Sequence, residues 1–155
     1  MGLFSFWKTK TADYFSASER DAILDAIKKA ELRTSGEVRV FIENRCKFVD
    51  PLDRAAEIFF SLKMDATADH NAVLVYLAMK DRQFAVFADQ GIYSALGKEY
   101  WDKEANKMIQ AFKKESYALG LATVVANIGE ALYQHFPYDE KVDKNELPDD
   151  IVFGK

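Results

Sequence analysis

The chain has 155 residues, of which 49% are hydrophobic and 30% charged, as expected for one globular domain whose twelve Phe and seven Tyr give an aromatic-rich core. The net charge of -4 comes largely from acidic residues near the C-terminus, so the preceding body is nearly neutral. The basic residues are scattered among acids, which excludes a nucleic-acid-binding surface.

Cellular location also has sequence signals. Cys46 is the single cysteine, which excludes an intramolecular disulfide and favours a reducing compartment. No apolar run reaches transmembrane length, and residues 1–7 are too short and lack the basic region of a signal peptide. We therefore expect a cytoplasmic protein without a transmembrane segment.

The first predicted elements are a helix and a strand. Ser18-Glu19-Arg20-Asp21 resembles a capping box with Asp in place of Glu, and the apolar positions that follow at helical spacing are Ile23, Ile27 and Ala30. The helix is expected to end near Thr34-Ser35-Gly36. Residues 37–43 then alternate as a half-buried strand does.

A second helix and a hairpin follow. Asp50 and Pro51 suit the N-cap and first position of a helix, whose buried stripe is expected to be Leu52, Ala56, Phe59 and Leu62. Residues 71–79 and 83–88 predict a hairpin whose first strand is central and whose second lies nearer an edge. The turn at residues 80–82 predicts that Met79 faces Gln83 and that Asp89 faces Val73.

Two more helices and a polar tail complete the chain. The helical positions of the first are Trp101, Ala105, Met108 and Phe112. Those of the second, which Ser116 opens, are Leu121, Val124, Ile128, Ala131 and Leu132. We assign one domain to residues 1–137 and an acidic tail to residues 138–155, extended or mobile up to residues 151–153, which can dock. A strand–helix–strand crossover makes the first two strands parallel, so the predicted fold is a three-layer α/β/α sandwich around a mixed sheet.

Polar residues gather at the open end of the predicted hairpin. Asp69, His70, Asn71 and Asp89 converge there, and the parallel neighbour begins with Glu37 at the same end. Neighbouring carboxylates repel by about 1 kcal/mol in water and about 4 kcal/mol at an effective dielectric near 20, so a bound cation or phosphate-binding donors would explain the arrangement. Hard oxygen ligands suit Ca²⁺ or Mg²⁺, whereas His70 is a poor ligand for them. The predicted metal ligands are Asp69, Asp89, Glu37 and Asn71.

The same residues also have purely structural interpretations. Asp89-Gln90-Gly91 can end a strand, with Asp89 in an Asx turn and Gly91 at a positive φ. Residues 35–37 can form a helix C-cap that leads into a strand, and His70 can be a hydrogen-bonded loop residue. These interpretations stay open beside the metal site.

Common catalytic signatures are absent from the sequence, including the nucleophile elbow, the P-loop and the zinc motif H-E-x-x-H. Cys46 lacks the short phosphate-cradling loop of a cysteine phosphatase, and residues 65–67 hold one of the two Asp that an aspartyl-phosphate enzyme needs. His70 and His135 are expected to lie apart. Hydrolysis of a phosphate ester would therefore have to be metal-assisted.

The order of several motifs resembles the TPM domain family. The resemblance rests on residues 34–40, on residues 71–76 followed by Asp81-Arg82, on residues 89–92 and on Trp101-Asp102, while residues 145–151 resemble the ending of a bacterial subgroup. It implies an α/β/α sandwich, a Ca²⁺ site in loops at one end of the sheet, and acid phosphatase activity in some members. This chain departs from the family pattern at His70 and Ala72, and Asp89 stands where a Gly is common.

Two functions follow from the sequence. One is a cation-binding TPM domain, with a weak metal-dependent acid phosphatase as its extension. The other is a non-catalytic interaction module, in which the acidic tail or the aromatic N-terminus with Phe4, Phe6 and Trp7 engages a partner protein or the membrane periphery. We expect a monomer and favour binding over catalysis.

Overall fold

The computed structural model describes residues 14–138 and 151–154. Its helices are α1 (Ala17–Arg33), α2 (Pro51–Ser61), the short 3₁₀ helix η3 (Met64–Ala66), α3 (Gln90–Leu96), α4 (Lys98–Lys113) and α5 (Tyr117–His135). Its strands are β1 (Glu37–Glu43), β2 (Ala72–Ala78), β3 (Gln83–Ala88) and β4 (Ile151–Phe153). Residues 139–150 of the predicted tail and the N-terminal aromatic residues lie outside this description.

The strands form a mixed sheet in the order β3-β2-β1-β4. β1 is parallel to β2 and to β4, whereas β2 and β3 are antiparallel. The parallel crossover, the central position of β2 and the edge position of β3 are therefore confirmed. Residues 151–153 pair with β1, so the end of the chain docks on the sheet as expected.

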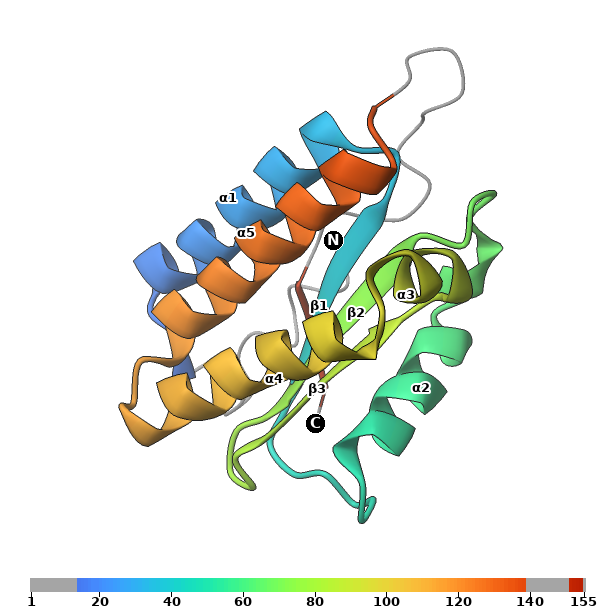
Figure 1. Cartoon of the computed structure of the whole chain (residues 1–155). Helices are drawn as coiled ribbons and strands as arrows, with labels where there is room; N and C mark the ends of the chain where they lie inside the picture. The colour runs from blue at the N-terminus through green and yellow to red at the C-terminus, as the bar shows by residue number, and fades with distance from the viewer. Residues whose placement is uncertain (1–13, 139–150, 155) are drawn as a thin grey trace.

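Helices cover both faces of the sheet, which makes the predicted three-layer sandwich. Figure 1 shows α2 on one face and α1, α4 and α5 on the other. β2 is buried along its whole length, because successive side chains point to opposite faces: Leu74 and Tyr76 pack with α2, while Val73, Val75 and Leu77 pack with the larger helical layer.

The start of α1 differs from the prediction by two residues. Ser16, not Ser18, is the N-cap: its hydroxyl accepts from the Glu19 amide at 3.1 Å, and the Glu19 carboxylate accepts from the Ser16 amide at 2.8 Å. Ser16-x-x-Glu19 thus forms a full capping box. At α5 the predicted Ser116 is the N-cap residue, although its hydroxyl makes no capping hydrogen bond.

The buried stripe of α2 is also rotated from the predicted one. Its buried residues are Ala55, Ile58 and Phe59, whereas Leu52 is 44% exposed. The Phe59 ring packs on the Phe87 ring of β3, with their centroids 4.8 Å apart. This orientation leaves Arg54, next to the buried Ala55, beside β1.

The hairpin register differs from the prediction by one residue. Ala78 faces Gln83 and Val73 faces Ala88, while the Asp89 amide donates to the Ala72 carbonyl at 2.9 Å. The reason lies in β1: the amides of Met79 and Lys80 each donate at 2.8 Å to the carbonyls of Glu43 and Asn44. Met79 therefore continues the parallel pairing and belongs to a longer turn.

Within the described residues, no helix combines the length and apolarity needed to cross a membrane.

Candidate functional site

Asp89 and His70 meet at the end of the sheet where β2 begins and β3 ends. Asp89 is 8% exposed and caps α3, its Oδ1 accepting from the Gln90 amide at 2.8 Å. Its Oδ2 lies 3.1 Å from Nδ1 of His70, whose side chain is 58% exposed. The sequence predicted their convergence but missed α3, which begins at this point.

Gly91 closes the loop of residues 69–71 against the first turn of α3. A Cβ at this position would lie 2.3 Å from the Asp69 carbonyl oxygen and 2.7 Å from that of His70. The purely structural interpretation expected a positive φ at Gly91, and this expectation is wrong. The residue of this loop with a positive φ is His70, at 50°. Close backbone approach, not turn geometry, is the reason for glycine here.

The other predicted ligands do not all join Asp89. Asn71 is 1% exposed, and its Nδ2 donates to the Ser35 hydroxyl at 3.2 Å. Its Oδ1 is buried without a hydrogen-bond partner in the described part of the chain. The Asp69 residue is exposed. Glu37 pairs with Ala72, and Asp89 lies beside Ala72 on the other side, because Val73 faces Ala88. The alternation of side chains therefore places Glu37 and Asp89 on the α2 face and Asn71 on the opposite face.

These placements bear directly on the predicted metal site. No group of three or more His, Cys, Asp or Glu side chains suited to a metal ion occurs within residues 14–138 and 151–154. What the loop brings together is one nearly buried carboxylate with neutral oxygens, and the carboxylate already has two donors.

A second cluster, which the sequence analysis missed, lies at the opposite end of the sheet. Glu43 is 5% exposed and ends β1. Its two oxygens accept from Nε and Nη2 of Arg54, both at 2.9 Å, and its Oε2 also accepts from the Tyr76 hydroxyl. Arg54 forms a further ion pair with Glu57. The pairing joins β1, β2 and α2, and residue order alone contains no signal for it.

The electrostatics of this cluster follow from burial and from Glu43. The hydrogen bonds to Glu43 raise the pKa of Arg54 beyond its ordinary value, against the opposing effect of burial. Burial, reinforced by the hydrogen bond to Glu43, raises the pKa of Tyr76. Both groups therefore keep their protons at neutral pH, with Arg54 charged and Tyr76 neutral, and neither is available as a general base.

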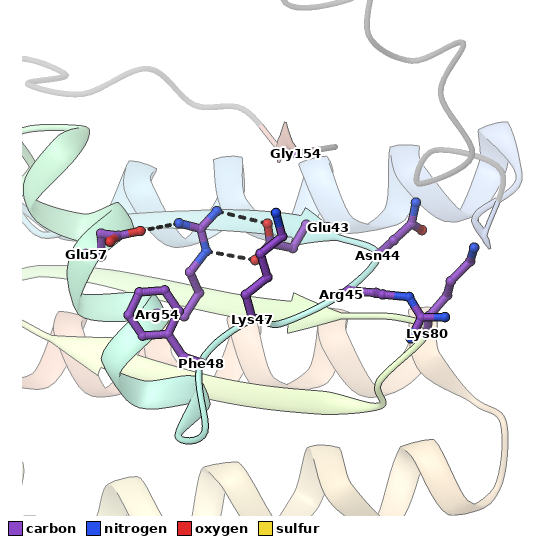
Figure 2. Close-up of a pocket in the computed structure, with 9 residues that line it drawn as sticks. All are labelled: Glu43, Asn44, Arg45, Lys47, Phe48, Arg54, Glu57, Lys80 and Gly154. Atoms are coloured by element: carbon purple, nitrogen blue, oxygen red, sulfur yellow. Dashed lines mark hydrogen bonds and ion pairs between the residues drawn. The ribbon is translucent and has the colours of Figure 1, made fainter.

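The cluster forms part of the wall of a groove of about 680 Å³. Figure 2 shows the side chains that line it: Glu43, Asn44, Arg45, Lys47, Phe48, Arg54, Glu57 and Lys80, with Gly154 of the C-terminal segment. They come from the end of β1 and the loop between β1 and α2, from α2, from the turn after β2, and from the residue that follows β4. A volume of this size is typical of sites for small ligands.

The TPM domain model matches residues 8–131, which is most of the chain. The chain belongs to the TPM domain family. This confirms the resemblance on which the sequence analysis relied. A comparison with curated proteins gives no match.

Solved structures agree with the family and the fold. The chain is 38% identical to the BA42 protein from the psychrophilic bacterium Bizionia argentinensis, with a TM-score of 0.82, over 90% of this chain and 95% of that one. The N-terminal domain of a protein from P. gingivalis is 16% identical with a TM-score of 0.65, over 83% and 85% of the two chains. That of the cg2496 protein from Corynebacterium glutamicum is 18% identical with a TM-score of 0.57, over 76% and 74%. These last two likenesses concern the fold alone.

Proposed function

We propose that this TPM domain binds a divalent cation, Ca²⁺ or Mg²⁺, where the loop of residues 69–71 before β2 meets the start of α3. The observation that carries the proposal is the nearly buried Asp89 carboxylate, 8% exposed and packed against a loop with other oxygen donors. Asn71 belongs to the same loop, and its buried Oδ1 has no hydrogen-bond partner in the described residues. Carboxylate and amide oxygens are the ligands that Ca²⁺ and Mg²⁺ prefer.

The donor set fits a weak site. At about 4 Å and an effective dielectric near 20, one carboxylate attracts a divalent cation by about 8 kcal/mol. The N-terminus of a helix repels a cation by only about 0.3–1 kcal/mol, so the attraction is the larger effect. Removal of the ion's water offsets much of this attraction. With few charged ligands, we expect a dissociation constant of about 10⁻⁴ to 10⁻³ M. The proposal keeps the four ligands predicted from sequence, Asp89, Asp69, Asn71 and Glu37. Glu37 and Asp89 lie on either side of Ala72, on the same face of the sheet.

His70 competes with the cation for Asp89. Its Nδ1 lies 3.1 Å from Oδ2 of Asp89, so an ion at that oxygen has to displace the imidazole. Replacement of His70 by Ala removes the competing donor. We therefore expect His70→Ala to bind the cation more tightly than the natural sequence.

A thermal-shift titration tests the proposal with matched variants. Metal-stripped protein at a tenfold excess of Ca²⁺ or Mg²⁺ over the dissociation constant should gain about 1.4 kcal/mol, or about 3–6 °C for a domain of this size. Asp89→Asn keeps a residue suited to the N-cap but removes the charge, so its shift should disappear. Asp102→Asn is the control, because Asp102 is exposed on α4. No shift in the natural sequence, or equal shifts in the two variants, would contradict the proposal.

A weak acid phosphatase activity is an extension of the same site. A bound cation would polarise the phosphate and activate water. The chain's own part is to hold the ion through Asp89 and its loop, and His70 can orient a phosphate oxygen. The expected result is slow release of phosphate from a model ester, dependent on the cation and lost in Asp89→Asn.

The interaction module remains the alternative, and residues 1–13 and 139–150, which carry its proposed contacts, lie outside the described residues. A test should replace the acids of residues 139–150 by Ser and keep residues 151–155, because β4 pairs with β1 and Ile151 is buried. Unchanged binding of partner proteins by this variant would contradict a role for the acidic tail. A monomeric state and a cytoplasmic location remain expectations of this proposal.

A further inference from the structure

We propose that the groove at the carboxyl ends of β1 and β4 binds a small organic anion that carries an aromatic ring. The groove lies at the opposite end of the sheet from Asp89, so this proposal does not depend on cation binding. It rests on the sheet topology, on the pairing of the charged side chains and on the arrangement of the lining residues in Figure 2.

The topology creates a crevice at this end of the sheet. β1 lies between β2 and β4 and is parallel to both. The connection from β1 to β2 passes through α2 on one face, whereas α1, α4 and α5 cover the other face. In open α/β sheets, ligands bind outside the carboxyl ends of strands at such a change of side. Gly154, Asn44 and Lys80 line the groove just after β4, β1 and β2.

The pairing of charges leaves positive side chains for a ligand. Glu43 and Glu57, the two acids that line the groove, both pair with Arg54. Arg45 pairs with Asp81 at 3.1 Å and is largely exposed. Lys47 and Lys80 are exposed and form no ion pair with any acid in residues 14–138 and 151–154. The groove thus concentrates unpaired positive charge in a chain whose net charge is -4, which favours an anionic ligand.

The remaining lining residues indicate what else the anion carries. Figure 2 shows Phe48 beside Arg54 toward one end of the groove, and Asn44, Arg45 and Lys80 at the other end, with Lys47 between them. Phe48 is 38% exposed, and an exposed ring is a stacking surface for a ligand ring. The Asn44 Oδ1 is buried without a hydrogen-bond partner in the described part of the chain, so it can accept from a ligand hydroxyl or N–H group.

Phosphate and carboxylate both satisfy these requirements, and an NMR titration of the full chain distinguishes them. The probes are a nucleoside monophosphate, an aromatic carboxylate, inorganic phosphate and an uncharged nucleoside. We expect saturable shifts in the millimolar range for the two ring-bearing anions, confined to residues 43–48, 54, 80 and 154. Inorganic phosphate should bind more weakly, and the uncharged nucleoside should bind weakest. The stronger of the two ring-bearing anions identifies the preferred charged group.

Matched variants separate this site from general attraction to positive charge. Lys47→Ala with Lys80→Ala should weaken binding of the ring-bearing anions about tenfold. Lys103→Ala with Lys113→Ala removes the same charge from exposed positions of α4 and should leave the affinity unchanged. Phe48→Ala should lower the affinity for the ring-bearing anions to that for inorganic phosphate.

Three results would overturn the proposal. The first is equal weakening in the two double-lysine variants, since it would indicate general electrostatic attraction. The second is a set of shifts spread over the whole surface or centred near residue 89. The third is the absence of saturation in the millimolar range for every probe. Because the substituted lysines are exposed, none of these results depends on a variant that fails to fold.

Discussion

Removal of the Arg54 side chain should strongly destabilise the fold, because it leaves Glu43 buried with its charge uncompensated. In Arg54→Met, Glu43 loses two N–H donors at 2.9 Å and keeps only the Tyr76 hydroxyl among its side-chain partners in the described residues. Met retains much of the packing of the Arg stem against its neighbours. The variant therefore isolates the loss of the charge and of its hydrogen bonds.

The expected magnitude follows from the burial of the pair. Breaking a buried ion pair costs about 3–5 kcal/mol; because the Arg54 side chain is 25% exposed, we expect the low end, about 3 kcal/mol. Glu43→Gln should cost about 1.5 kcal/mol, since Arg54 still has Glu57 and solvent. The double variant should cost about 2.5 kcal/mol, which makes the coupling energy about 2 kcal/mol.

Urea unfolding at neutral pH, followed by tryptophan fluorescence, measures all four free energies of the cycle. Arg33→Met is the control, because Arg33 and Glu130 form an ion pair at 2.8 Å whose side chains are about half exposed; it should cost about 1 kcal/mol or less. The reasoning is refuted if Arg54→Met costs no more than this control. It is also refuted if the coupling energy is below about 0.5 kcal/mol, the limit of additivity for independent sites.

Three further predictions concern other parts of the fold. Gly91→Ala should destabilise the protein by about 2–4 kcal/mol in urea unfolding, because its Cβ would lie 2.3 Å from the Asp69 carbonyl oxygen; an effect below about 0.5 kcal/mol would contradict the close approach. Burial raises the pKa of Tyr100 in the folded protein. The contribution of Tyr100 to stability is therefore complete below the ordinary tyrosine pKa of about 10, and it is lost by about 1.4 kcal/mol per pH unit as the pH rises from there toward the folded-state pKa. Tyr100→Phe should therefore flatten the alkaline decline in stability, and an unchanged slope would contradict this. Ser16→Ala should lower the free energy of unfolding by about 1 kcal/mol, because it removes the capping box with Glu19. Ser18→Ala should not lower it by more than Ser16→Ala does.

The helical and strand periods of the sequence were sufficient to predict most elements and their layers. Local spacing shows the buried face of each element, as for Ile23 and Ile27 in α1 and for the wholly apolar β2. The crossover rule then predicts that β1 and β2 are parallel. The convergence of Asp89 with His70 was predictable for the same reason, since it depends on the hairpin alone. The one-residue error in its register did not prevent the two residues from meeting.

Tertiary contacts decided what local periods cannot report. The register of β3 depends on Glu43 and Asn44 of β1, whose carbonyls bind the amides of Met79 and Lys80. The rotation of α2 accompanies the pairing of Arg54 with Glu43. The groove likewise joins residues from separate segments of the chain, with Gly154 far from the others in sequence. Sequence by itself determined the family, the layers and the Asp89 loop of this protein, because those depend on short-range pattern; the groove and its charge pairing depend on long-range packing and became visible only in the folded chain.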